Sequence, residues 1–141
     1  MPRAEPSSDT CTFCRIVAGE SPAHLVSSDE TCLALLAAPP AAYGHVLVIP
    51  RQHVDTLWEA DAPLAEATMR TAQRISVLLR QRLGPDGLTV RQNNGSASGQ
   101  VISHLHIHLV PRWHGDGSIG WPHPPTEPLD PDTVLRTLLA Q

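Results

Sequence analysis

Three histidines alternate with apolar residues in the segment His104-Leu105-His106-Ile107-His108-Leu109-Val110. If this segment is an extended strand, the three imidazoles lie on one face and the apolar side chains enter the core on the other. A single metal ion cannot bind all three, because residues i and i+4 of a strand lie about 13 Å apart whereas two nitrogen ligands of one zinc ion lie about 3.3 Å apart. At least one imidazole therefore remains for other chemistry.

A neutral histidine can attack phosphorus or accept a proton, and a protonated one can hold an anion. The alternation therefore favours phosphoryl or nucleotidyl transfer, while hydrolysis at carbon stays open on these residues alone. A half-exposed strand that carries histidine at its polar positions by chance would need that choice three times within five residues. One or two of the three histidines can still lack a role in the chemistry.

The loop before the histidines, Asn93-Asn94-Gly95-Ser96-Ala97-Ser98-Gly99-Gln100, is rich in glycine and small polar side chains. Such a loop can direct several backbone N–H groups toward a phosphate. A hairpin connection that needs glycine for a positive φ explains the loop equally well, and only its position beside the histidines favours phosphate. The sequence matches neither the Walker nor the dinucleotide-binding fingerprint.

The chain holds three cysteines, of which Cys11 and Cys14 form a C-x-x-C pair. An odd number of cysteines in a chain without an export signal indicates metal binding or redox activity for this pair, rather than a structural disulfide. Cys32 begins the apolar run 32–36, which predicts a small buried hydrophobic residue at this position.

An α+β fold is expected to position these residues. Short connections between successive strands favour an antiparallel sheet over a parallel, doubly wound one. Capping residues and apolar periodicity predict a short helix from Cys11 to Ala18, a long helix from the N-cap Asp61 to Leu83, and a short C-terminal helix over 130–140. Apolar and β-branched runs predict strands at 24–27, 32–36, 46–49, 88–93 and 101–110, the last ended by Pro111.

Length and composition exclude several classes of protein. The 141 residues suffice for one domain, expected over 11–141 after a loose tail at 1–10. A net charge of -4, from 10 basic and 14 acidic residues, argues against nucleic acid as a partner. No apolar stretch reaches the roughly 20 residues of a membrane span, and the N-terminus lacks the apolar core of a signal peptide. We therefore expect a cytoplasmic protein without a membrane partner.

The motif at 104–110 resembles that of the histidine triad (HIT) family, in which three histidines alternate with apolar residues. The segments 11–18, 43–53 and 93–112 are similar to the bacterial branch of that family in order and spacing. The resemblance implies a HIT-like antiparallel five-stranded sheet with one long helix and a short C-terminal helix, assembled as a homodimer. It also implies a purine nucleotide substrate whose α-phosphorus bond is cleaved.

The resemblance assigns roles to individual residues. His106, the middle histidine of the motif, would be the nucleophile that forms a nucleotidyl-histidine intermediate. His108 would hold the phosphate oxygens or the leaving group, and His45 would flank the same pocket. The phosphate pocket would be lined by Asn93, Gly99, Gln100 and the backbone N–H of Val101. In the zinc-containing branch, the ligands of a structural zinc ion correspond to Cys11, Cys14, His53 and His104.

Two positions depart from the family pattern. Val101 stands where some relatives have serine, which leaves only a backbone donor and predicts slower or differently selective turnover. Ala37 stands where the family has an aspartate that binds the ribose. The main hypothesis is a nucleotide hydrolase or transferase acting on a nucleoside 5′-phosphoramidate or a dinucleoside polyphosphate. The alternatives are a nucleotide-binding regulator with little turnover, for which Ala37 is the argument, and a redox or metal-handling protein that uses Cys11 and Cys14.

Overall fold

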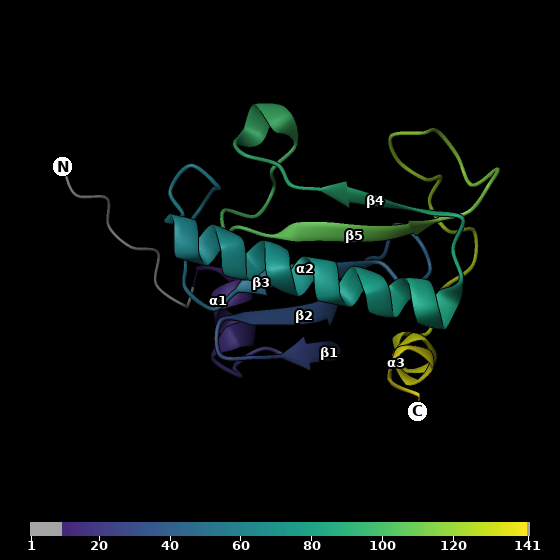
Figure 1. Ribbon diagram of the computed structural model, residues 1–141, viewed down its shortest axis with the longest axis horizontal. Coiled ribbons are helices and arrows are strands. Elements are labelled where there is room, and N and C mark those ends of the chain that lie inside the picture. The colour runs from purple at the N-terminus through teal and green to yellow at the C-terminus, as the bar shows by residue number, and fades with distance from the viewer. Residues whose placement is uncertain (1–9, 141) are drawn as a thin grey trace.

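The computed structural model describes residues 10–140. Along the chain, in the order of Figure 1, the elements are α1 (Thr12–Val17), β1 (Leu25–Ser28), β2 (Cys32–Leu36), β3 (Val46–Pro50), α2 (Ala62–Leu83), β4 (Gly87–Arg91), the 3-10 turn η1 (Ser96–Ser98), β5 (Ile107–Arg112) and α3 (Pro131–Leu139). The expected tail at 1–10 falls almost wholly outside the described residues. No helix within 10–140 combines the length and apolar character needed to cross a membrane.

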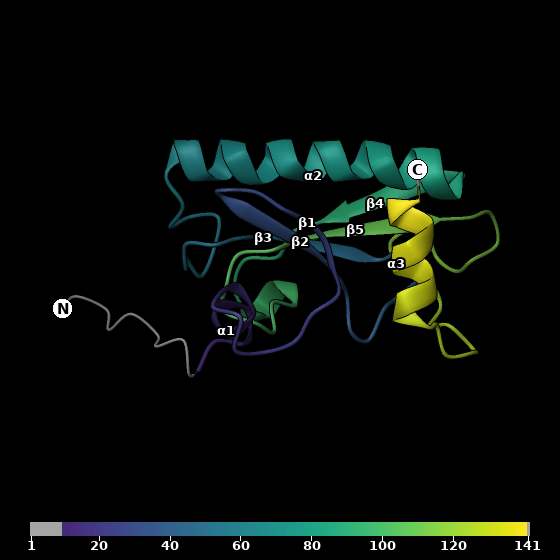
Figure 2. The ribbon, with the colours of Figure 1, turned by 90° about the horizontal axis from the view of Figure 1, so that it is seen from below.

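Within these residues the strands form one five-stranded sheet in the order β1-β2-β3-β5-β4, and every neighbouring pair is antiparallel. The long helix α2 covers one face of the sheet, whereas α1 and η1 lie on the opposite side (Figure 2). α3 packs against α2 and β1 at one end of the sheet. The α+β architecture expected from the sequence is confirmed.

The two faces of the sheet bury separate apolar clusters. All residues of β2 and β3 are buried, so the alternate side chains of these central strands serve both faces. Cys32, Ala34 and Val48 pack toward α2, where Ile75 and Leu79 are almost fully buried. The cluster on the other face is smaller and lies under α1. The histidine site belongs to this second face.

The long helix has the ends that its sequence predicts. The Asp61 carboxylate accepts a hydrogen bond from the backbone N–H of Leu64, and Gly84 ends the helix in the left-handed region at φ 60°. Such ends depend on residues close in sequence, which is why they can be located without a structure. The short helices α1 and α3 also lie within one residue of the ranges expected for them.

The strand expected at 101–110 is only partly correct. Regular pairing begins at Ile107, so His104 and His106 precede β5, and the backbone N–H of Leu105 donates instead to the carbonyl of Val54. The strand also continues past Pro111, which pairs with Leu88 of β4. β3 pairs with β5 only as far as Leu109, so β5 has one neighbour beyond that point and a residue without an N–H is tolerated.

A glycine fixes the turn that leads into β3. Gly44 has a φ of 81°, in the left-handed region that favours glycine. A Cβ atom at this position would collide with the side chain of Leu83 at the end of α2. The turn therefore lies directly against the end of α2, and β3 begins just after His45.

Candidate active site and metal-binding cluster

Two cysteines and two histidines from separate parts of the chain meet at one end of the histidine segment. Cys11 caps α1, Cys14 lies in its first turn, His53 follows β3, and His104 precedes β5. Their ligand atoms all lie within 4.8 Å of one another. The Sγ atom of Cys11 lies 3.3 Å from Nδ1 of His104, and that of Cys14 lies 3.2 Å from Nδ1 of His53. Distances of this size fit two ligands of one tetrahedral zinc ion.

Hydrogen bonds at the far side of each ring show which nitrogen faces the cluster without a proton. Nε2 of His104 donates to the carbonyl of Pro50 at 2.8 Å, and Nε2 of His53 donates to the carboxylate of Asp55 at 2.7 Å. In the neutral rings both Nδ1 atoms are therefore acceptors, and they face each other at 3.2 Å. Two lone pairs at that distance suit a shared cation, and a second hydrogen bond of this kind is typical of histidine ligands.

The cysteines do not resemble a reactive dithiol. Burial and the neighbouring Cys11 raise the pKa of Cys14 to about 12, whereas redox-active thiols have lowered pKa values. All three cysteines are free thiols rather than disulfide partners. These observations favour the metal-binding interpretation of the C-x-x-C pair over the redox one.

His106 is held in one tautomer by the backbone. Its Nδ1 lies 2.7 Å from the carbonyl oxygen of His104, and because a carbonyl only accepts, Nδ1 carries the proton. Nε2 of His106 therefore holds a free lone pair. Burial lowers the pKa of His106, although the hydrogen bond to the carbonyl opposes this, so the ring is neutral at pH 7. A buried neutral imidazole with an unprotonated Nε2 can act as a nucleophile.

His45 and His108 form a hydrogen-bonded pair with a defined direction. The backbone N–H of Ala41 donates to Nδ1 of His45 at 2.9 Å, so Nε2 of His45 carries that ring's proton. This Nε2 donates to Nδ1 of His108 at 3.0 Å, which leaves the proton of His108 on its own Nε2. His108 thus offers an N–H donor beside His106, whose ring centroid lies 5.0 Å away.

Burial and mutual proximity keep this pair uncharged. Burial first, and then the neighbouring His108 and His106, lower the pKa of His45 to about 3. Burial, His106 and Arg91 lower the pKa of His108 to about 4. His45, His106 and His108 are therefore neutral at pH 7. They act through lone pairs and N–H groups rather than through positive charge.

The glycine loop follows the strand β4 and precedes the histidine segment in the chain. Gly99 has a φ of 101°, and a Cβ atom there would lie 3.5 Å from Nδ2 of Asn93. The side chain of Val101 is exposed, which leaves its backbone N–H as the group of interest at this position. That Asn93, Gly99 and Val101 contact a phosphate stays a prediction.

Gln100 is engaged within the protein itself. Its side-chain oxygen accepts from the backbone N–H of Gly95 at 2.7 Å, and its nitrogen donates to the carbonyls of Asp55 at 2.6 Å and Ile102 at 3.0 Å. These bonds fasten the loop to the segments that follow His53 and precede His104. Direct binding of phosphate by Gln100 stays a prediction, and the bonds themselves describe a positioning role.

Sequence reasoning did not find two aromatic side chains that contact the histidines, nor the arginine that stacks on one of them. Phe13 packs edge-on against His104 and His106, with ring centroids 5.6 Å and 5.2 Å apart. Trp121 lies edge-on to both His45 and His108. Arg91 stacks on Trp121 and was not predicted at all. The one sequence signal that could have indicated a role for Arg91 is its basic side chain on the strand that leads into the glycine loop.

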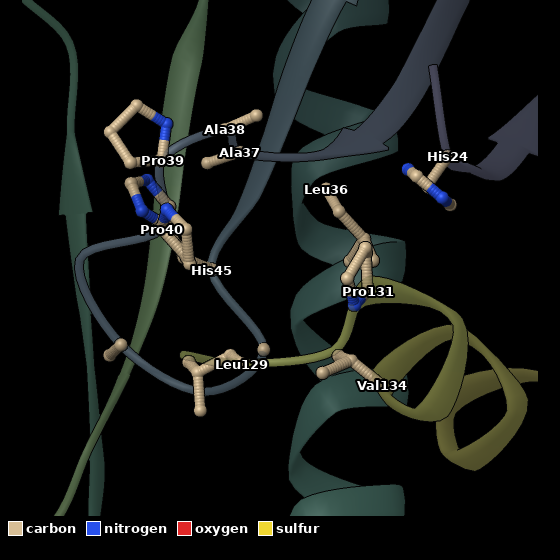
Figure 3. Close-up of a pocket in the computed structure, with 12 residues that line it drawn as sticks. His24, Leu36, Ala37, Ala38, Pro39, Pro40, His45, Leu129, Pro131 and Val134 are labelled. Atoms are coloured by element: carbon tan, nitrogen blue, oxygen red, sulfur yellow. The ribbon is translucent and has the colours of Figure 1, made fainter. Parts of the chain in front are cut away.

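Ala37 borders a cavity at the end of β2. Figure 3 shows Ala37, Ala38 and the two prolines that follow them near His45 on one side, with residues of α3 and His24 on the other. The lining is mostly apolar and includes no carboxylate among the described residues. The structure thus provides no acidic side chain in this cavity to replace the missing aspartate.

The fold and the histidine row are those of a known class of proteins. The structure is similar to a zinc-bound histidine triad family protein from Mycobacterium smegmatis, with a TM-score of 0.84, 34% identity and coverage of 95% of this chain and 94% of that chain. A HIT-like protein from Bartonella henselae has the same TM-score at 29% identity, and covers 96% of this chain and 98% of its own. Residues 18–115 match the HIT domain. The chain belongs to the HIT domain family.

Relatives with named activities are also similar in sequence. An adenylylsulfatase of Arabidopsis thaliana is 40% identical over 75% of this chain, although the match spans only 54% of that longer protein. An adenosine 5′-monophosphoramidase of Schizosaccharomyces pombe is 31% identical over 84% of this chain and 88% of its own length. Protein hit of Bacillus subtilis is 37% identical over 77% and 76%.

Proposed function

We propose that this protein is a nucleotide hydrolase or nucleotidyl transferase that cleaves the bond between the α-phosphorus of a nucleotide and its leaving group. The substrate would be a nucleoside 5′-phosphoramidate or a phosphoanhydride, as in a dinucleoside polyphosphate. The observation that carries this proposal is the pair of fixed tautomers, because His106 offers a lone pair and His108 offers an N–H hydrogen-bond donor side by side. The names of the relatives from Arabidopsis and fission yeast support the same reaction class.

The reaction would proceed by two displacements at phosphorus. Nε2 of His106 attacks the α-phosphorus, a P–N bond forms, and the bond to the leaving group breaks with its electron pair on the departing atom. Water then attacks the same phosphorus, the P–N bond breaks, and the nucleoside monophosphate is released. His106 returns to its neutral form with Nε2 free, and the protons released by the attacking water pass to solvent. The nitrogen of a phosphoramidate takes the proton it needs from solvent in the first displacement.

The remaining groups would stabilise charge on the phosphoryl oxygens. The Nε2–H of His108 donates toward the phosphate while His45 holds this ring in the required tautomer. The backbone N–H of Val101, which follows Gln100 in the loop that Gln100 positions, would add a further donor. None of these groups has to ionise, so they are already oriented before the substrate binds.

We further propose that Cys11, Cys14, His53 and His104 hold a zinc ion. The distances among their ligand atoms and the two opposed nitrogen lone pairs fit this ion, and the related protein from Mycobacterium smegmatis is described as zinc-bound. A zinc ion with four protein ligands has no open position, so it would contribute to folding rather than to the reaction. This site also gives His104 a structural role.

The experiment that tests the function is the capture of the covalent intermediate. Wild-type protein is mixed with adenosine 5′-phosphoramidate, quenched rapidly and digested, and mass spectrometry locates any adenylyl group. We expect an adduct on His106, no AMP release by His106→Ala, and normal turnover by the control variant His114→Ala, whose ring is exposed on a distant turn. An adduct on another residue, or turnover by His106→Ala near the wild-type rate, would contradict the assignment.

One observation favours a second candidate function, that of a nucleotide-binding regulator with little turnover. The apolar cavity beside Ala37 lacks the carboxylate that the family uses for ribose, which weakens the case for a specific nucleotide substrate. A regulator would bind AMP in equilibrium dialysis but would release no AMP from either a phosphoramidate or a dinucleoside polyphosphate.

A further inference from the structure

An arginine stands at the end of the histidine row that lies farthest from the proposed metal site. Arg91 of β4 pairs directly with His108 of β5, and side chains of such a cross-strand pair lie on the same face of the sheet. The proposed metal ligand His104 lies at the other end of the row, four residues before His108. The segment of three histidines therefore has a proposed metal-binding end at His104 and an arginine end at His108.

The guanidinium group of Arg91 is held in place. Its Cζ lies 4.0 Å from the centroid of the Trp121 ring, and Nη2 donates to the carbonyl of Gly120 at 3.1 Å. The same tryptophan ring contacts His45 and His108 edge-on, with both centroids at 5.8 Å. Stacking on an aromatic face orients a guanidinium group while its remaining N–H donors stay available.

Among the residues that the structure describes, this guanidinium has no acidic partner. Within residues 10–140, Arg74 and Arg112 form ion pairs with Asp29 and Asp116, but no carboxylate pairs with Arg91. The histidines beside it are neutral, so Arg91 is the fixed positive charge next to the proposed reaction centre. A fixed, unpaired arginine beside a phosphate-handling site is suited to bind a second anionic group.

We infer that Arg91 is a specificity-determining residue that binds a negatively charged leaving group, such as the sulfate of an adenylyl sulfate or the phosphate of a phosphoanhydride. This inference rests on the proposed function and narrows its substrate class. Such a leaving group departs with the electron pair of its P–O bond and needs no proton, whereas the nitrogen of a phosphoramidate must be protonated to leave. Arg91 stabilises the first kind of departure and gives no comparable help to the second.

The test compares two substrates that differ in the charge of the leaving group. Values of kcat/KM are measured for adenosine 5′-phosphosulfate and adenosine 5′-phosphoramidate with wild type, Arg91→Met and Arg91→Lys. Arg82→Met is the matched control, because it removes one positive charge from the end of α2, on the other face of the sheet. Thermal unfolding of each variant shows whether the fold is kept.

We expect Arg91→Met to lower the ratio of phosphosulfate to phosphoramidate kcat/KM at least about tenfold, the size of effect that charge-assisted hydrogen bonds give. Arg91→Lys should give an intermediate ratio, and Arg82→Met the wild-type ratio. An equal loss on both substrates in Arg91→Met and Arg91→Lys would overturn the inference, because it would mean that Arg91 only supports Trp121.

A failure of the proposed function would look different. In that case wild type would release AMP from neither compound. The dissociation constants of the two compounds for wild type and Arg91→Met, measured by calorimetry, would then decide the inference: a selective loss of phosphosulfate affinity supports it, and equal affinities contradict it.

Discussion

At His106 a single carbonyl oxygen decides which nitrogen can react. The hydrogen bond from Nδ1 to the backbone of His104 places the lone pair on Nε2, and the relay from Ala41 through His45 places a proton on Nε2 of His108. Two chemically identical rings thereby acquire opposite roles. The bond that fixes His106 joins residues only two apart in the chain, whereas the proton of His108 depends on His45, which is 63 residues away. The alternation of histidines alone could therefore not predict both roles.

A residue-scale prediction concerns the ribose. Ala37 cannot accept hydrogen bonds from the 2′- and 3′-hydroxyl groups, so wild type should distinguish AMP from 2′-deoxy-AMP poorly. Ala37→Asp should bind AMP more tightly relative to 2′-deoxy-AMP, because charge-assisted hydrogen bonds contribute roughly 1.5 to 3 kcal/mol each. Both affinities are measured by calorimetry. A preference of wild type for AMP above about tenfold, roughly 1.4 kcal/mol, would show that another residue binds the ribose.

At the scale of elements, the proposed zinc site would stabilise α1. This helix has only six residues, and isolated helices of that length are not stable in water. Its cap and its first turn supply Cys11 and Cys14, so a metal ion would attach it to the segments that carry His53 and His104. The metal would therefore stabilise the packing of α1 on one face of the sheet.

We accordingly predict that Cys11→Ser and Cys14→Ser lower both the zinc content and the Tm, from about one zinc ion per chain in wild type. Zinc is measured by elemental analysis of protein purified without added metal. Cys32→Ala is the control, since Cys32 is buried outside the cluster, and its zinc content should equal that of wild type. Unchanged zinc and Tm in both serine variants would show that the ligands are misassigned.

Elements also show how far the sequence could predict this molecule. The helix α2 and its ends follow from residues close in the chain, and the strand at 32–36 was located correctly. The strand at 101–110 was not, because its true start at Ile107 depends on where β3 and β4 offer partners. Arg91 was missed as a neighbour of His108 because only the cross-strand register places them side by side. Trp121 was missed because the segment after β5 folds back onto His108.

At the scale of the whole molecule, the pair formed by buried His45 and half-buried His108 makes the fold sensitive to acid. Burial is the main cause of their lowered pKa values, about 3 and about 4, while an unfolded histidine titrates near 6.5. Between these values the unfolded chain binds more protons than the folded chain. The free energy of unfolding should therefore decrease as the pH falls from about 6.5 toward about 4.

Urea unfolding at several pH values in this range measures the slope. The double variant His45→Gln, His108→Gln should show a shallower slope, because it lacks these two titrating rings. The proposed zinc ligands are present in both proteins, so the difference between the slopes isolates the pair. Equal slopes would mean that other groups cause the loss of stability in acid.

The homodimer implied by the family resemblance is a further prediction at this scale. Light scattering at micromolar concentration should give a mass of about two chains, as is common for symmetric oligomers. A mass of one chain would refute it.

The bonds of Gln100 have a consequence for anyone who assays this protein. Its amide joins the glycine loop to the carbonyl of Asp55, just beyond the proposed ligand His53, and to the carbonyl of Ile102, just before the proposed ligand His104. Loss of the metal would therefore change the position of the glycine loop through the bonds of Gln100 alone. If zinc binds as proposed, a preparation with fractional metal content would contain two forms of the protein with differently placed loops. Rates and apparent KM values would then vary between batches with the metal content.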